Sequence, residues 1–201
     1  ASRDAHDVIN DIGFGWYQIK YTFLIGISYF TSAMGFAILA VTTSVLKTQW
    51  ELQNTPAAML MSSAAAGMLA GSAAGGMLAD LFGRRKAVIF SLVGICFFIF
   101  AMPTAIHHSF AIFYSFGFGF FYLTGLLSGN VLLGEIFPTA DRHLSSIYGD
   151  VFFQAGLISG NTIVALHSEN LNLQELNWRS LWFFIAIPAV FATIMCVFHL
   201  D

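Results

Sequence analysis

The stretch Gly76-Met77-Leu78-Ala79-Asp80-Leu81-Phe82-Gly83-Arg84-Arg85-Lys86 separates two long apolar runs, at residues 57–79 and 87–106. A helix needs about 20 apolar residues to cross a bilayer core, and each run supplies them. Gly83 permits a tight reversal of the chain, and Asp80 faces three consecutive cations near the end of the first run. The stretch therefore predicts two antiparallel membrane-spanning helices joined by a short charged loop.

The composition of the whole chain supports a membrane protein. Of its 201 residues 57% are hydrophobic and only 9% are charged, whereas soluble domains carry about 25% charged residues. The two cysteines, Cys96 and Cys196, lie inside apolar runs, which argues against a disulfide scaffold. A net charge of −3 offers no basic surface for a nucleic-acid partner. These features exclude a disordered chain and most soluble enzymes.

Apolar runs recur along the chain and are separated by short polar breaks. Their length predicts six membrane-spanning helices in an all-α membrane protein, and no ten-residue alternation of the outer-membrane strand type competes with them. The predicted spans are residues 21–46, 57–79, 87–106, 110–133, 144–166 and 181–200. Residues 21–201 therefore form one helical bundle embedded in a lipid bilayer.

The two ends of the chain and its cations predict the orientation. Residues 1–20 read as an amphipathic lead-in along the cytoplasmic surface, or as a disordered one. Lys and Arg residues favour the cytoplasmic side of a membrane. If both ends of the segment are cytoplasmic, six of the eight Lys and Arg residues lie on that side and two on the other, so we expect this orientation. The larger group is Arg3, Lys20, Arg84, Arg85, Lys86 and Arg142, and the smaller one is Lys47 and Arg179. Because the chain begins with Ala and stops just after an apolar run, we expect it to be part of a longer protein.

Four stretches carry a family resemblance. The opening stretch resembles the signature G-x-L-A-D-(R/K)-x-G-R-(R/K) of the major facilitator superfamily, with Leu81 departing from its usual cation. The run from Glu135 to Arg142 resembles the E-x-x-P-x-x-x-R element of sugar- and organic-ion-type members. Residues 12–20 resemble the entry to the first helix of synaptic-vesicle-protein-like, organic-ion and phosphate-type members. Trp178-Arg179-Ser180-Leu181 resembles their W-R-x-L entry to the sixth helix.

The resemblance implies a fold and a mechanism. Six helices would form the N-terminal half of a secondary transporter, whose partner is a C-terminal six-helix half of the same parent chain or a second half-unit. The halves would alternate access to a midplane site for an organic ion, a sugar-like solute or an inorganic anion. The family's cytoplasmic charge network would use Gly76, Asp80, Gly83, Arg84, Arg85, Glu135 and Arg142.

Polar residues inside the spans are the candidates for binding and coupling. Asp150 lies eight residues after Arg142, about 12 Å further along a helix, and Gln154 follows it on the same face. Asp150 has two interpretations: a proton or cation site, or an anion paired with the Arg84–Arg85 cluster. Two further polar residues at depth, suited to solute binding or to helix–helix hydrogen bonds, are Asn130 and Asn161.

Other expected groups are missing. Ser32 and Gly35 stand where related members carry acids, and Ser115 stands where they carry an arginine. These losses suit an uncoupled facilitator, and they keep open an alternative function as a transport-incompetent structural or receptor-like subunit. The sequence holds no hydrolase or metalloprotease motif, so we expect no enzyme activity, cofactor or metal.

Glycines at a spacing of four predict where helices pack closely. Such glycines let two backbones approach within a bilayer, and in the family the second and fifth helices lie between the two halves. In this chain they are Gly67, Gly71 and Gly75 in the second span, Gly125 and Gly129 in the fourth, and Gly156 and Gly160 in the fifth. We likewise expect Gly76 to let a neighbouring helix approach.

Overall fold

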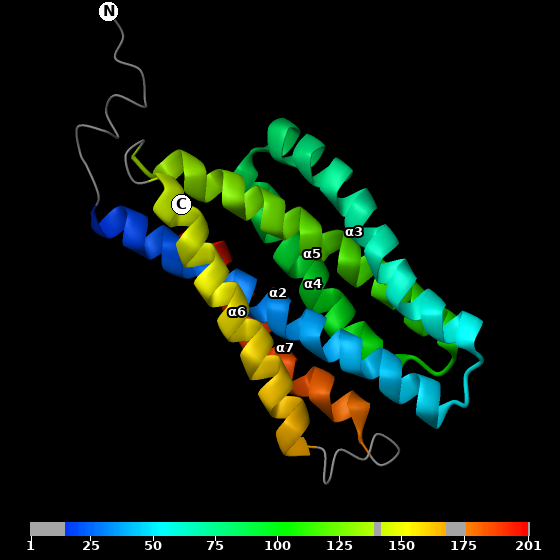
Figure 1. The fold of residues 1–201 in the computed structure, drawn as a ribbon. Helices are drawn as coiled ribbons and strands as arrows, with labels where there is room; N and C mark the ends of the chain where they lie inside the picture. The colour runs from blue at the N-terminus through cyan, green and yellow to red at the C-terminus, as the bar shows by residue number, and fades with distance from the viewer. Residues whose placement is uncertain (1–14, 139–141, 168–175, 201) are drawn as a thin grey trace, which may run out of the picture.

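A computed structural model describes residues 15–138, 142–167 and 176–200, and this part of the chain is almost entirely helical (Figure 1). Its six α-helices and one 3-10 turn (η1) confirm the predicted all-α class. The elements are α2 (Trp16–Gln49), α3 (Asn54–Phe82), α4 (Arg84–Ala101), η1 (Met102–Thr104), α5 (His108–Ile136), α6 (Arg142–His167) and α7 (Trp178–His199).

Two helix ends differ most from the predicted spans. Helix α2 begins at Trp16, inside the predicted lead-in, because the Gln18 side chain accepts a hydrogen bond from the Gly15 N–H at 3.0 Å and caps the helix. Residues 1–14 of the lead-in lie outside the described part of the chain. Helix α4 ends at Ala101, short of residue 106, where Pro103 introduces the η1 turn.

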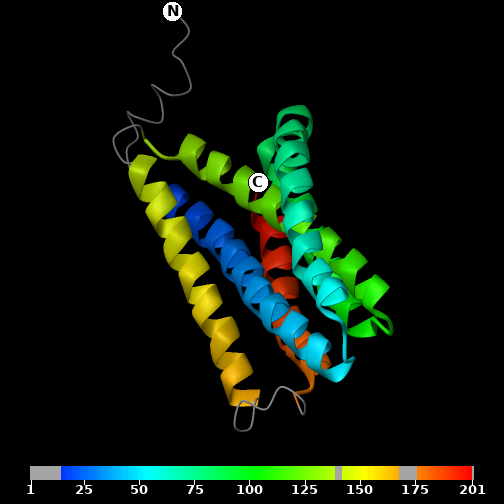
Figure 2. The same cartoon turned by 45° about the vertical axis from the view of Figure 1, so that its right-hand side comes forward.

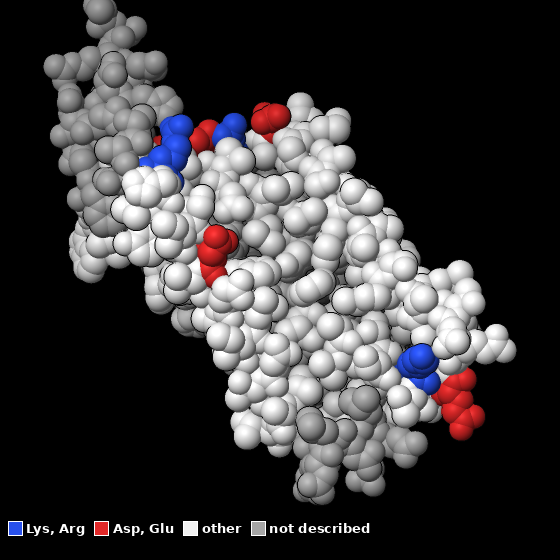
Figure 3. All heavy atoms as spheres, viewed as in Figure 1, with Lys and Arg blue, Asp and Glu red and all other residues white. Residues whose placement is uncertain are grey.

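The helices have the length and apolarity that a bilayer requires. Five of those described are both long and apolar enough to span it, namely α2, α3, α4 with η1, α5 and α7. Helix α6 has 26 residues, enough to cross at 1.5 Å per residue, but its polar side chains keep it outside that group. Most charged side chains gather at the two ends of the bundle, and one isolated acidic group lies in the broad band between them (Figure 3).

The six helices form two consecutive triplets, and the middle helix of each triplet packs mainly on a helix of the other triplet. Helices α2–α4 make the first triplet and α5–α7 the second, yet α3 packs mainly on α5 and α6 packs mainly on α2 (Figures 1 and 2). Each middle helix thus lies against the first helix of the other triplet, as in the inverted repeats of transporters. The arrangement encloses α2 and leaves much of α3 and α6 on the outside.

One end of the bundle is closed by aromatic and cationic contacts. Trp182 is fully buried and donates its indole N–H to Thr42 Oγ1 at 3.1 Å. Arg179 donates from Nε to the Pro103 carbonyl at 2.9 Å and from Nη2 to the Ala105 carbonyl at 3.2 Å. Its guanidinium also lies 4.7 Å from the centre of the Trp178 ring. These bonds tie the start of α7 to the link between α4 and α5.

Candidate functional site

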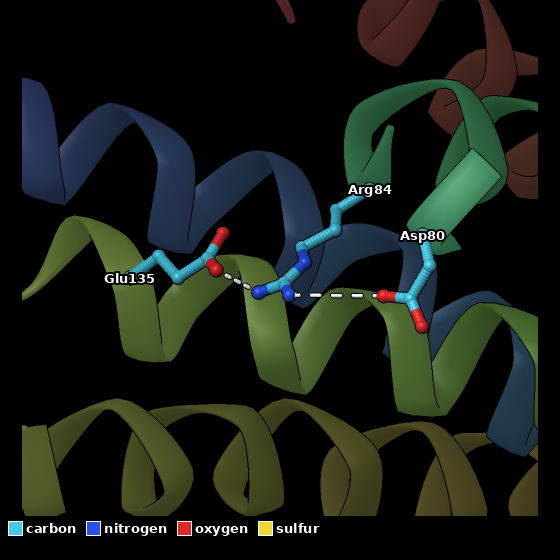
Figure 4. Close-up of polar contacts among 3 residues, drawn as sticks. All are labelled: Asp80, Arg84 and Glu135. Carbon is cyan, nitrogen blue, oxygen red and sulfur yellow. Dashed lines mark ion pairs between the residues drawn. The ribbon is translucent and has the colours of Figure 1, made fainter. Parts of the chain in front are cut away.

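Three charged side chains meet at the other end, where α3, α4 and α5 converge (Figure 4). Arg84 forms an ion pair with Glu135 of α5, and its Nη2 lies 3.9 Å from Asp80 Oδ1 on α3. Arg84 is the least exposed of the three, with 31% of its side chain accessible. One guanidinium therefore bridges two helices, although such partly hydrated pairs each contribute only about 0–1 kcal/mol.

Gly83 sets the position of this cluster. Its φ of 90° lies in the left-handed region, which a side chain disfavours, and it is the single residue between α3 and α4. Within the described chain no helix approaches Gly76: a Cβ built there would meet no atom within 4 Å, because Gly76 lies on the exposed face of α3. Close packing of a helix at Gly76 therefore stays a prediction.

The remaining predicted members of the network lie at the same end of the bundle. Arg85 follows Arg84 in the first turn of α4, and Arg142 is the exposed first residue of α6. The structure therefore brings Asp80, Arg84 and Glu135 into contact and places these two cations nearby.

The glycines of α3 form a close seam with α5, here named the α3–α5 seam. A Cβ at Gly67 would overlap the carbonyl oxygen of Phe116, and one at Gly71 would overlap that of Phe120. Gly75 faces Thr124, whose hydroxyl donates to the Gly71 carbonyl at 3.0 Å. This seam faces inward, within the bundle.

The glycines of α6 form a corresponding seam with α2, here named the α6–α2 seam. A Cβ at Gly156 would overlap the Phe30 carbonyl oxygen. At Gly160 it would stand 3.0 Å from both the Met34 carbonyl oxygen and the Ala37 Cβ. The opposite side of α6 is thereby left facing outward.

That outward face of α6 carries the polar residues predicted at depth. Asp150, Gln154 and Asn161 are all exposed, and their spacing puts them along one side of the helix. In Figure 3 acidic atoms lie over α6, isolated from the charged ends. Within the described residues no ion pair links Asp150 to a cation, and Arg84 has its partners elsewhere. The pairing of Asp150 with Arg84 is therefore not observed.

Asn130 belongs to a different environment, beside a tyrosine that the sequence did not single out. Tyr29 of α2 donates its hydroxyl to the Leu126 carbonyl at 2.9 Å and lies against Gly129 and Gly149. The exposed Asn130 carboxamide lies at the same junction, with its Oδ1 3.8 Å from a Cβ built on Gly149. The sequence signal for this contact is the pair of glycines on either side of the tyrosine, Gly129 of α5 and Gly149 of α6, which leave room for a large side chain between the two helices.

A second unpredicted feature is a small cavity beside the charge network. It measures about 80 Å³ and is bounded by Gly75, Asp80, Arg84 and Ser128, among others. Ser128 Oγ is the buried side-chain oxygen or nitrogen atom that has no hydrogen-bond partner among the described residues.

Three positions where related members carry ionisable groups, Ser32, Gly35 and Ser115, are buried within the bundle. Ser32 and Ser115 each donate to a carbonyl of their own helix, and a Cβ at Gly35 would stand 2.8 Å from the Phe118 ring. A long charged side chain does not fit beside that ring. In the part of the chain that is described, no group of three or more His, Cys, Asp or Glu residues could hold a metal ion.

Exchanged triplets of long apolar helices, with a charged hairpin loop at one end, are the arrangement expected for one half of a membrane transporter built from inverted repeats. The family model of the Major Facilitator Superfamily matches residues 25–201, so the chain belongs to this superfamily. Its relatives and its fold are those of transporters rather than enzymes.

Several known proteins are similar over most of the chain. The putative transporter svop-1 of Caenorhabditis elegans is 25% identical over 182 residues, which is 90% of this chain and 34% of that protein. The synaptic vesicle 2-related protein of Xenopus laevis is 27% identical over 198 residues, covering 94% and 34%. The chain thus spans about a third of the length of these relatives.

Solved structures share the fold. The proton:xylose symporter XylE bound to 6-bromo-6-deoxy-D-glucose superposes with a TM-score of 0.75 at 17% identity, over 90% of this chain and 44% of that one. The inward-open xylose transporter XylE from E. coli gives a TM-score of 0.74 at 18% identity, over 90% and 48%. The match to about half of each structure confirms the expected half of a major-facilitator fold.

Proposed function

We propose that this chain supplies the N-terminal half of a secondary transporter that moves a small solute by alternating access. The solute is an organic ion, a sugar-like molecule or an inorganic anion, and the second half is a C-terminal six-helix bundle of the same parent chain. The family membership supports transport in general. The observation that carries the finer proposal is the uncovered polar face of α6.

This face suits a solute pathway because polar side chains are costly against lipid. Asp150, Gln154 and Asn161 would face hydrocarbon if nothing covered α6. A second half opposite α6 would enclose them beside a water-filled path at membrane depth. Asp150 is then the candidate coupling residue, with Gln154 and Asn161 as candidate solute contacts.

The charge network is proposed to act on conformation instead of binding solute. Arg84 links α4 to α3 and α5 at one end of the bundle, far from the middle of α6. We assign this end to the cytoplasm, because it also carries Arg85, Lys86 and Arg142. Both ends of the segment would then be cytoplasmic.

The test is uptake by the full-length protein in proteoliposomes, screened with the three solute classes under imposed pH gradients. If Asp150 couples transport, Asp150→Asn abolishes the response to the pH gradient while Asn161→Ala weakens solute affinity. Thr162→Val, on the same helix, serves as the control. Uptake that follows the gradient equally in Asp150→Asn rules out the coupling role. No uptake of any solute class would favour a structural or receptor-like subunit.

A further inference from the structure

An apolar groove opens between the end of α3 and the beginning of α4, at the reversal formed by Gly83. It is about 290 Å³ in volume and its walls are almost wholly apolar. The side chains that line it are Leu78, Phe82, Lys86, Ala87 and Phe90. Phe82 and Phe90 are 61% and 49% exposed, so the described chain leaves the groove open.

The charge at this groove is of one sign. Lys86 is its only charged lining residue among those described, and Arg84 and Arg85 precede it in the chain. Arg84 is neutralised by Asp80 and Glu135, whereas no ion pair of Lys86 occurs within the described residues. An occupant with an apolar tail and a negative head would therefore match both the walls and the rim.

A second groove at the same end of the bundle provides a comparison. It lies between α2 and α6, measures about 330 Å³ and is also largely apolar. Its lining residues are Ile19, Thr22, Phe23, Tyr148 and Phe152, with no charged side chain among them. The second groove thus has no cation in its own lining, although Lys20 lies in an adjoining pocket that shares Ile19 and Phe23 with it.

We propose that the α3–α4 groove is a binding site for an anionic phospholipid of the adjacent leaflet. One acyl chain lies between Leu78, Phe82 and Phe90, and the phosphate of the headgroup pairs with the ammonium group of Lys86. Because Lys86 lies in the first turn of α4, two residues after Arg84, the lipid would bind within one helical turn of the charge network.

Photo-crosslinking tests this site directly. The full-length protein is reconstituted in phosphatidylcholine vesicles with a trace of phosphatidylglycerol or phosphatidylcholine that carries a diazirine in one acyl chain. We expect phosphatidylglycerol to label the segment 78–90 about fivefold more than phosphatidylcholine, the preference that one lysine near a membrane surface gives. At the α2–α6 groove, which Lys86 does not line, labelling by the two lipids should not change in Lys86→Gln.

Two variants separate the head and tail contributions. Lys86→Gln should remove the preference for phosphatidylglycerol, while the control Lys20→Gln, at the same end of the bundle, should retain it. Leu78→Trp fills the groove and should lower labelling by both lipids. Equal labelling of segment 78–90 by both lipids would overturn the proposal, as would a preference that survives Lys86→Gln. It would also fail if a benzophenone side chain at position 82 crosslinked to another part of the protein in place of lipid.

Discussion

The α3–α5 and α6–α2 seams occupy equivalent places in the two triplets, yet they differ in how closely their backbones meet. In the α3–α5 seam both Gly67 and Gly71 lie against backbone carbonyls of α5. The approach is reciprocal, because Gly119 of α5 lies against the Ala64 carbonyl of α3. Two helices that each provide glycines can touch backbone to backbone over several turns.

In the α6–α2 seam a backbone carbonyl would overlap an added Cβ at one glycine only. Gly156 lies against the Phe30 carbonyl, but Gly160 is in looser contact. Helix α2 contributes Gly26, and the Phe152 ring of α6 packs against it. At this point α2 therefore meets a side chain of α6 and not its backbone. The comparison teaches that α6, the helix with the outward polar face, is fixed less tightly than α3.

The largest expected effect is that of Gly71→Ala in the α3–α5 seam. Its new methyl would overlap the Phe120 carbonyl, which cannot move without shifting α5, so we expect a loss of about 2–3 kcal/mol in unfolding free energy. Thermal unfolding in detergent should show a fall in Tm of about 5–10 °C. Gly76→Ala on the same helix meets open space and is the control, which should not lower Tm. A neutral Gly71→Ala would refute the close seam.

Next in size is Gly156→Ala in the α6–α2 seam. The overlap with the Phe30 carbonyl again requires a helix to move, but α6 has fewer close contacts to break. We expect a loss of about 1–2 kcal/mol, measured by the same thermal unfolding. Gly134→Ala, where nothing lies within 4 Å, is the matched control. If Gly156→Ala were more damaging than Gly71→Ala, the order of the two seams would be reversed.

A smaller effect is expected from Thr124→Val, which removes the one side-chain hydrogen bond across the α3–α5 seam. The hydroxyl donates to the Gly71 carbonyl at 3.0 Å, and interhelical bonds of this kind contribute about 0.6 kcal/mol. Thr162→Val provides the control, since its hydroxyl bonds only within α6, to the Ile158 carbonyl. Equal unfolding free energies for the two valine variants would show that the bond adds nothing to the seam.

The sequence predicted some of these features better than others, for physical reasons. Spans follow from length and apolarity, and a spacing of four aligns Gly67 with Gly71 on one face whatever the partner is. The helix that these glycines contact is set by the packing of α3 on α5, which belongs to the other triplet. No local sequence pattern indicates this packing. The pairing of Asp80 with Arg84 lies within four residues, but that of Arg84 with Glu135 spans the hairpin and rested on the family resemblance. The exposure of Gly76 is likewise a tertiary property that the local sequence does not encode.

The smallest effect, Gly160→Ala, decides whether the difference between the seams is local. Its methyl would stand 3.0 Å from the Met34 carbonyl oxygen, a contact relieved by a shift of a few tenths of an ångström. In the α3–α5 seam the corresponding position is Gly75, where a methyl would stand 3.0 Å from the Thr124 Cα. Alanine also favours the helix over glycine by about 1 kcal/mol, so we expect both variants to change the unfolding free energy by about zero.

Thermal unfolding of Gly75→Ala and Gly160→Ala side by side measures this directly. Equal, near-zero changes would locate the difference between the seams at Gly67 and Gly71, where α5 presents its carbonyls, because the outer glycines would then be interchangeable. If Gly160→Ala instead costs as much as Gly71→Ala, α6 is held as tightly as α3. The looser attachment inferred for the helix that carries Asp150 would then be wrong.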